Sequence, residues 1–229
     1  MNRRLPVLLS VLSLVSFLPG VALAEVLDRI VAKVNGHIIL QSDWEDALRL
    51  EAFLNGRAPH ELSSTERNAL LRRLVDQELL EEQMRSADFP RASEDEVNDQ
   101  VAEIRKQYPE AQGEQSWGQL LARHGITEEQ LRRRLALQLD LSRLIDARLR
   151  PSVHIDAQTI ASYYNHELLP RLRNSGAKEV SLDEASAGIK QLLTEQRLNQ
   201  LLVAWLENLR SGSEIQTQPS LPGSPDGRR

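Results

Sequence analysis

The stretch Val26-Leu-Asp-Arg-Ile-Val-Ala-Lys-Val-Asn-Gly-His-Ile-Ile-Leu40 decides how the fold begins. Two runs rich in β-branched residues flank Asn35-Gly36, and Asn-Gly suits a two-residue hairpin turn because both turn residues need a positive φ. A hairpin alone is only marginally stable in water. The sequence therefore predicts an opening β-hairpin that packs on helices or accepts a third strand from elsewhere in the chain.

Capping signals mark the helices that follow the hairpin. In a capping box, a Ser or Thr side chain caps the amide three residues on, and the Glu or Gln found there reaches back to the cap. The chain carries this pattern at Ser42 with Glu45, Ser63 with Glu66, Ser93 with Glu96, and Thr127 with Gln130. Asp156 and Ser181 are expected to cap two further helices. With the Gly and Pro stops, these signals predict helices over residues 43–54, 65–87, 94–108, 116–124, 128–149, 157–171 and 183–210.

Two of these helices carry more apolar surface than an ordinary surface helix. The leucines of 128–149 spread around most of the helix, so we expect it to lie between neighbours. On 183–210 the apolar face changes side part-way along, so its two halves should pack on different elements. One face holds Ile189, Leu192 and Leu193, and largely the opposite one holds Leu198, Leu201, Leu202, Trp205, Leu206 and Leu209. Residues 213–217 are then free to supply the third strand. The predicted fold class is mainly α: a helical bundle with an N-terminal β-hairpin joined by a short C-terminal strand.

Residues 1–24 have the three-part pattern of an export signal. Arg3 and Arg4 precede an apolar run over 5–18, and small residues stand before the expected cleavage at Glu25. A membrane anchor is the weaker alternative, because the run is shorter than the roughly 20 residues that span a bilayer. We therefore expect a periplasmic protein that is cleaved from its signal and is not stably inserted in the membrane.

The composition excludes several classes of function. The chain has no cysteine, so it holds no disulfide, thiolate nucleophile or cysteine-based metal site. It also lacks nucleotide-binding glycine motifs and a G-x-S-x-G elbow, and its net charge of -5 argues against nucleic acid as a partner. Residues 218–229, rich in Pro, Gly and Ser, are expected to be a disordered tail. The histidines fall in separate segments, away from metal-ligand spacing: His37, His60, His124, His154 and His166.

Charged runs on the predicted helices have ordinary explanations. The acid pairs Glu81-Glu82 and Glu128-Glu129 are interpreted as helix electrostatics instead of general acid and base groups. Arg132-Arg133-Arg134 is interpreted as a solvated helix face. We therefore predict no catalytic residue, no metal site and no cofactor, and we do not expect an enzyme.

An ordered series of segments resembles the SurA-type periplasmic chaperones. It runs from the opening hairpin to the last helix and strand, and it spans residues 25–217. Many relatives insert a parvulin-type prolyl isomerase domain before the final helix, whereas residues 174–180 leave no room here for a domain of about 50 residues. The segments are Asp28–Asp43, Leu74–Leu80, Gly125–Leu131, Leu144–Val153, Tyr163-Tyr164, Trp205–Arg210 and Ile215.

The resemblance implies a helical cradle, with helix 183–210 packing back on the N-terminal part, that holds unfolded exported polypeptides without ATP. Outer-membrane protein precursors are the clients it implies. Two alternatives stay open: a family member with residual isomerase activity, and a structural partner of one envelope protein. The oligomeric state is left open as well. The expected peptide-binding residues, each of which has core packing as its alternative, are Trp44, Phe53, Leu54, Met84, Phe89, Trp117, Leu120 and Leu121.

Overall fold

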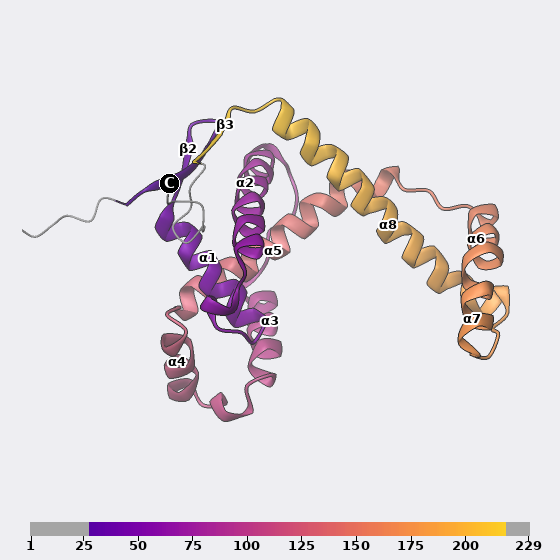
Figure 1. Ribbon diagram of the computed structural model, residues 1–229, viewed down its shortest axis with the longest axis horizontal. Coiled ribbons are helices and arrows are strands. Elements are labelled where there is room, and N and C mark those ends of the chain that lie inside the picture. Colours follow the sequence, from indigo (N-terminus) through magenta and orange to yellow (C-terminus); the bar gives the residue numbers. More distant parts are fainter. Residues whose placement is uncertain (1–27, 219–229) are drawn as a thin grey trace, which may run out of the picture.

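A computed structural model describes residues 28–218; the expected export signal and the tail beyond Gln218 lie outside this range. The fold is mainly α, as predicted, with a small antiparallel sheet (Figure 1). The strands are β1 (Ile30–Val34), β2 (His37–Leu40) and β3 (Ile215–Thr217). The α helices are α1 (Gln41–Leu54), α2 (Ser64–Ser86), α3 (Glu94–Lys106), α4 (Glu114–Arg123), α5 (Glu128–Leu149), α6 (Ala157–Tyr163), α7 (Leu169–Ser175) and α8 (Leu182–Ser211).

The opening hairpin receives its third strand from the end of the chain, which confirms the prediction for residues 213–217. The strand order is β2-β1-β3, and both neighbours run antiparallel to β1. Asn35 and Gly36 have φ values of 47° and 90°, as a two-residue turn of this type requires. The Asn35 side chain also accepts a hydrogen bond from the Glu214 amide at 2.9 Å, so the turn itself holds the returning strand.

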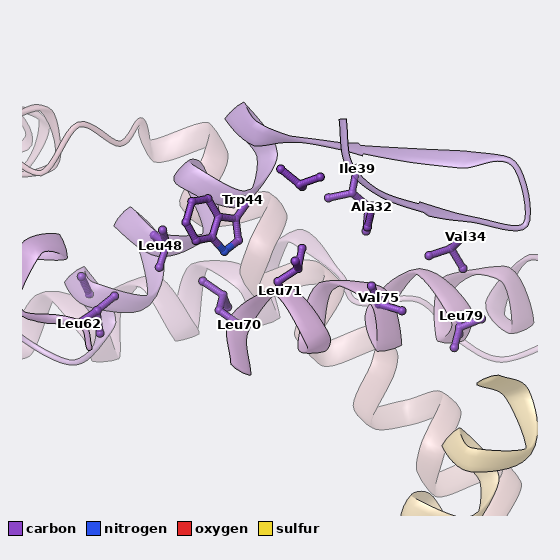
Figure 2. Packing of buried hydrophobic residues seen from close by; sticks show 12 residues of the cluster. Ala32, Val34, Ile39, Trp44, Leu48, Leu62, Leu70, Leu71, Val75 and Leu79 are labelled. Atoms are coloured by element: carbon purple, nitrogen blue, oxygen red, sulfur yellow. The ribbon is translucent and has the colours of Figure 1, made fainter. Parts of the chain in front are cut away.

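The sheet is stabilised by packing on α1 and α2. Val31, Ala32 and Val34 of β1 are almost fully buried against apolar residues of the two helices. Figure 2 shows Val34 above Val75 and Leu79 of α2, with Trp44 and Leu48 of α1 farther along the same interface. This cluster is the first hydrophobic core.

A second core lies where α3, α4 and α5 meet the end of α1. Its centre is Phe53, Trp117 and Leu131, which are fully buried. Helix α5 contacts α2, α3 and α8, which confirms that it lies between neighbours. The apolar side chains of α5 therefore pack against neighbouring helices on several sides.

Helix α8 joins the main body to a separate pair of helices (Figure 1). Its C-terminal half packs on α2 and α5 through Trp205, Leu206 and Leu209, which belong to a third cluster with Leu80 and Leu144. Its N-terminal half packs on α6 and the π-helical segment Tyr164–Leu168. The predicted change of apolar face along α8 is confirmed. We call α6, the π-helical segment, α7 and the N-terminal half of α8 (residues 182–197) the arm.

The helix expected over 157–171 differs from the one observed. It has a π-helical segment at Tyr164–Leu168 and continues as α7 to Ser175. Pro170 accounts for the change, because it has no N–H to donate to the His166 carbonyl and its ring crowds that carbonyl. The widened turn keeps the helix going past the proline.

The predicted caps at Ser63, Ser93, Thr127, Asp156 and Ser181 are all present. The capping box predicted at Ser42 and Glu45 is wrong. Helix α1 begins directly after β2, at Gln41, and the Asp43 carboxylate accepts from the Leu40 amide at 2.9 Å. The Ser42 hydroxyl is bound to Asp28 instead.

Acid should weaken the cap of α2 through Glu66. The hydrogen bond from Arg57, followed by those from Ser63, lowers the pKa of Glu66 from 4.5 to about 2. A carboxylate with a lowered folded-state pKa stabilises the fold above its unfolded pKa, and this stabilisation is lost as the pH falls from about 4.5 to about 2. We expect Glu66→Gln to lower the melting temperature at pH 7 and to make it fall less than in the wild type between pH 5 and pH 2.5. Equal acid sensitivity of the two proteins would contradict this.

Candidate functional site

Most of the expected peptide-binding residues lie in the interior. Trp44 belongs to the first core, Met84 to the third, and the others to the second. In this conformation they support the fold and present almost no surface to a ligand. The six buried residues are Trp44, Phe53, Met84, Trp117, Leu120 and Leu121.

The aromatic residues of the second core contact one another instead of a groove. Phe53 stacks on Tyr108 with ring centroids 5.1 Å apart, and the Tyr108 hydroxyl donates to the Phe53 carbonyl at 2.8 Å. Trp117 lies 6.0 Å from Phe53, and the Arg105 guanidinium covers its ring at 5.2 Å. These contacts indicate that the aromatic residues stabilise the second core.

Phe89 and Leu54 are half-buried, with different surroundings. The Arg91 guanidinium lies 4.5 Å from the centre of the Phe89 ring and also donates to the Met84 carbonyl, so it closes over this end of the third core. Leu54, by contrast, lines a cleft. Of the expected residues, Leu54 is the one in the wall of this cleft.

The cleft that Leu54 lines has a volume of about 360 Å³ and lies between β2, α1 and α2, with Arg134 of α5 also in its wall. We call it the α1–α2 cleft. Sequence reasoning missed it because its residues come from four elements. Its larger apolar residues are Ile38, Ile39, Leu50, Leu54, Leu70 and Leu74.

The acids of the α1–α2 cleft already have partners. Arg49 binds Asp46, Arg73 binds Glu51 at 2.9 Å, and Arg85 binds Glu78 at 2.7 Å. Asp43 caps α1. Beside the cleft, burial is the main reason that the pKa of Glu81 is raised. The cleft wall therefore combines apolar side chains with acids that already have partners.

Arg134 differs from the solvated helix face predicted for Arg132-Arg133-Arg134. Its side chain is partly buried, and burial is the main cause that lowers its pKa. Arg133, by contrast, is exposed and pairs with Glu129 one turn away. The prediction holds for Arg133 and is wrong for Arg134.

The arm carries a second candidate surface. A hollow of about 500 Å³ is lined by Tyr163 and His166 together with Leu193 of α8. On α8 itself, Leu192 is 42% exposed and Val203, three helical turns farther on, is 56% exposed. No residue of 157–175 is buried, so the arm is held by shallow contacts. The sequence signal for this surface was the change of apolar face along α8.

Residues 28–218 contain neither a metal-binding cluster nor a membrane-spanning helix. No group of three or more His, Asp or Glu side chains there is arranged to hold a metal ion. No helix of this part of the chain has both the length and the apolarity to cross a bilayer.

A comparison with family models identifies the group of proteins to which these elements belong. The model described as "SurA-like N-terminal domain" matches residues 4–145, which is more than half of the chain. The chain belongs to the SurA-like N-terminal domain family. The match ends within α5, so the arm, the rest of α8 and β3 lie beyond the region by which the family is recognised.

A solved structure has a similar fold over most of the chain. It comes from a study of PEB4 and Cj1289 of Campylobacter jejuni, described as two structurally related SurA-like chaperones. The match covers 84% of this chain and 100% of that one, with a TM-score of 0.52 and 10% identity. At that identity the likeness supports the fold alone. No curated protein sequence matches the chain.

Proposed function

We propose that this protein is an ATP-independent periplasmic chaperone that holds unfolded exported polypeptides, outer-membrane protein precursors among them. The observation that carries the proposal is membership of the SurA-like N-terminal domain family. Two apolar side chains of α8, Leu192 and Val203, lie open to solvent on the helix that links the body to the arm, and they are the contacts to test.

The physical character of this surface suits clients of many sequences. Apolar contacts are weakly directional, so a surface of Leu and Val residues accepts different side chains without a fixed register. The net charge of -5 opposes association between copies while this surface is open. Binding of moderate affinity, followed by transfer to a partner that folds the client, requires no nucleotide.

The short connection before α8 supports a holding function without prolyl isomerase activity. Helix α7 ends at Ser175, Gly176 has a left-handed φ of 68°, and Ser181 caps α8. The residues between the two helices, 176–180, thus form a turn, not the place of an inserted domain. A proline-limited refolding assay with the protein as additive tests this part of the proposal, and we expect no acceleration above the uncatalysed rate.

The holding function is tested by suppression of aggregation. We expect the protein, added in stoichiometric excess, to keep a urea-unfolded outer-membrane barrel protein soluble after dilution, as followed by light scattering. An unrelated unfolded soluble protein serves as the second client. If neither client is protected, the proposed function is wrong; binding to one folded envelope protein would then favour a partner role.

Charges placed on the exposed face of α8 should impair this activity. Leu192→Glu with Val203→Glu removes two apolar contacts worth about 1 kcal/mol each, so half-maximal protection should need about thirtyfold more protein. The matched control is Gln191→Glu with Gln200→Glu, which adds the same charge at exposed polar positions of the helix. Equal loss in both variants would show that charge, not apolar contact, matters.

A further inference from the structure

The outer edge of β2 is open for pairing at Ile38. β2 is an edge strand in the order β2-β1-β3. The two-residue turn makes Val34 and His37 a bonded pair, so by alternation the N–H and C=O of Ile38 point to the free side. In the described part of the chain, no backbone hydrogen bond from another element reaches Ile38. The other outward amide of β2, that of Leu40, is bound to Asp43, so an extended segment can add to this edge through the two backbone groups of Ile38.

The α1–α2 cleft adjoins that edge. Ile38 and Ile39 of β2 are part of its wall, and Ile38 is 47% exposed. Leucines 50, 54 and 74 line the cleft from α1 and α2. A strand added beside β2 would thus have an apolar pocket next to it for one side chain.

Arg134 supplies a cation to the same cleft. Within residues 28–218 no carboxylate lies within ion-pair distance of its guanidinium, which donates to Gln77. Glu51 and Glu81 act on it only at longer range. The acids that line the cleft are bound by other arginines or cap α1, so Arg134 has charge available for an incoming anion.

We propose that the α1–α2 cleft binds the C-terminal end of an unfolded client as a short strand beside β2, with the terminal carboxylate on Arg134 and the last apolar side chain among Leu50, Leu54 and Leu74. The inference rests on the proposed function and names the part of the client that is recognised. A cation beside an apolar wall suits a ligand that carries a carboxylate and an apolar side chain on the same carbon. The last residue of a polypeptide carries both on its Cα. The cleft volume of about 360 Å³ suits the end of a polypeptide, because a chain that ends inside the cleft needs no second opening for further residues.

The test compares peptides that differ at one group. A fluorescein-labelled peptide of alternating valine and threonine that ends in phenylalanine is prepared with a free C-terminal carboxylate and, separately, with an amide. We expect the amide to bind at least tenfold more weakly in anisotropy titrations with the full chain. A third peptide, amidated and with an internal Glu before the phenylalanine, separates a side-chain carboxylate from the terminal one. If it binds as tightly as the free acid, the proposal is wrong.

Two variants test whether Arg134 is the residue that binds the peptide carboxylate. Arg134→Gln should weaken the free-acid peptide to the level of the amide and leave the amide unchanged. Arg133→Gln makes the same charge change on the same helix at an exposed position, and it should preserve the difference between the peptides. If both variants lose that difference equally, the effect is one of overall charge and the site is wrongly assigned.

The outcome is separable from that of the proposed function. A wild-type protein that suppresses aggregation but binds acid and amide peptides equally would overturn the inference and leave the chaperone proposal standing. N-methylation of the peptide at alternate amides tests the added strand, since methyl groups on the inward amides should abolish binding and those on the outward amides should not. Equal effects at both registers would overturn pairing to β2.

Discussion

Replacing Phe53 with alanine is expected to lower the free energy of unfolding by about 3–5 kcal/mol. Phe53 is completely buried, stacks on Tyr108 and contacts Trp117, so the substitution leaves a cavity at the centre of the second core. For a chain of this length the melting temperature should fall by roughly 6–20 °C. Urea titration followed by circular dichroism measures the change.

The neighbouring residue gives a matched control. Leu54 is half-exposed at the cleft, so Leu54→Ala should cost much less stability than Phe53→Ala although both are on α1. The comparison also decides between the two interpretations of Phe53. A Phe53→Ala protein that keeps its stability but no longer protects clients would show that Phe53 contributes to client binding instead of to the core.

Replacing Ile189 with alanine is expected to release the arm without unfolding the body. Ile189 is the buried residue of α8 within the arm, and no residue of 157–175 is buried. A loss of about 2–4 kcal/mol at this contact should accelerate amide exchange by about 30-fold to 1,000-fold. Hydrogen–deuterium exchange with mass spectrometry should locate the change in residues 157–175.

The body provides the internal reference for that measurement. Amides of α1, α2 and α5 should keep their protection, because their cores do not involve Ile189. Lys190→Ala, at the exposed next position, should leave the arm protected as well. Loss of protection throughout the chain would show instead that arm and body unfold as one cooperative unit.

Local signals predicted the elements well, because the forces that set them are local. Five caps, the Asn35-Gly36 turn and the face change of α8 depend on residues within a few positions of one another. The start of α1 was missed because β2 runs straight into it, so Asp43 caps earlier than the Ser42 pattern indicates. At 157–171 the π-helical segment before Pro170 and the continuation to Ser175 were missed.

The candidate site was less predictable, since exposure depends on contacts between distant segments. Phe53 and Trp117 were expected at a binding surface, yet they pack on each other and on Tyr108. The three residues come from α1, α4 and the segment after α3. Arg134 looks like its exposed neighbour Arg133 in sequence. It differs because α5 turns that position toward α2, where Arg134 meets Gln77. The free edge of β2 followed from knowing that β3 pairs on the other side of β1.

The pairing of β1 with β3 has a consequence for how the protein is made. β1 is synthesised before the helices, but Ala32 pairs with Thr217, so the second neighbour of β1 is available only after those helices have been made. During vectorial synthesis, the hairpin must therefore remain incomplete until that point. The sheet is thus completed only after the helices have been made, and a chain stalled short of residue 215 would be left with an unfinished strand edge for proteases to recognise.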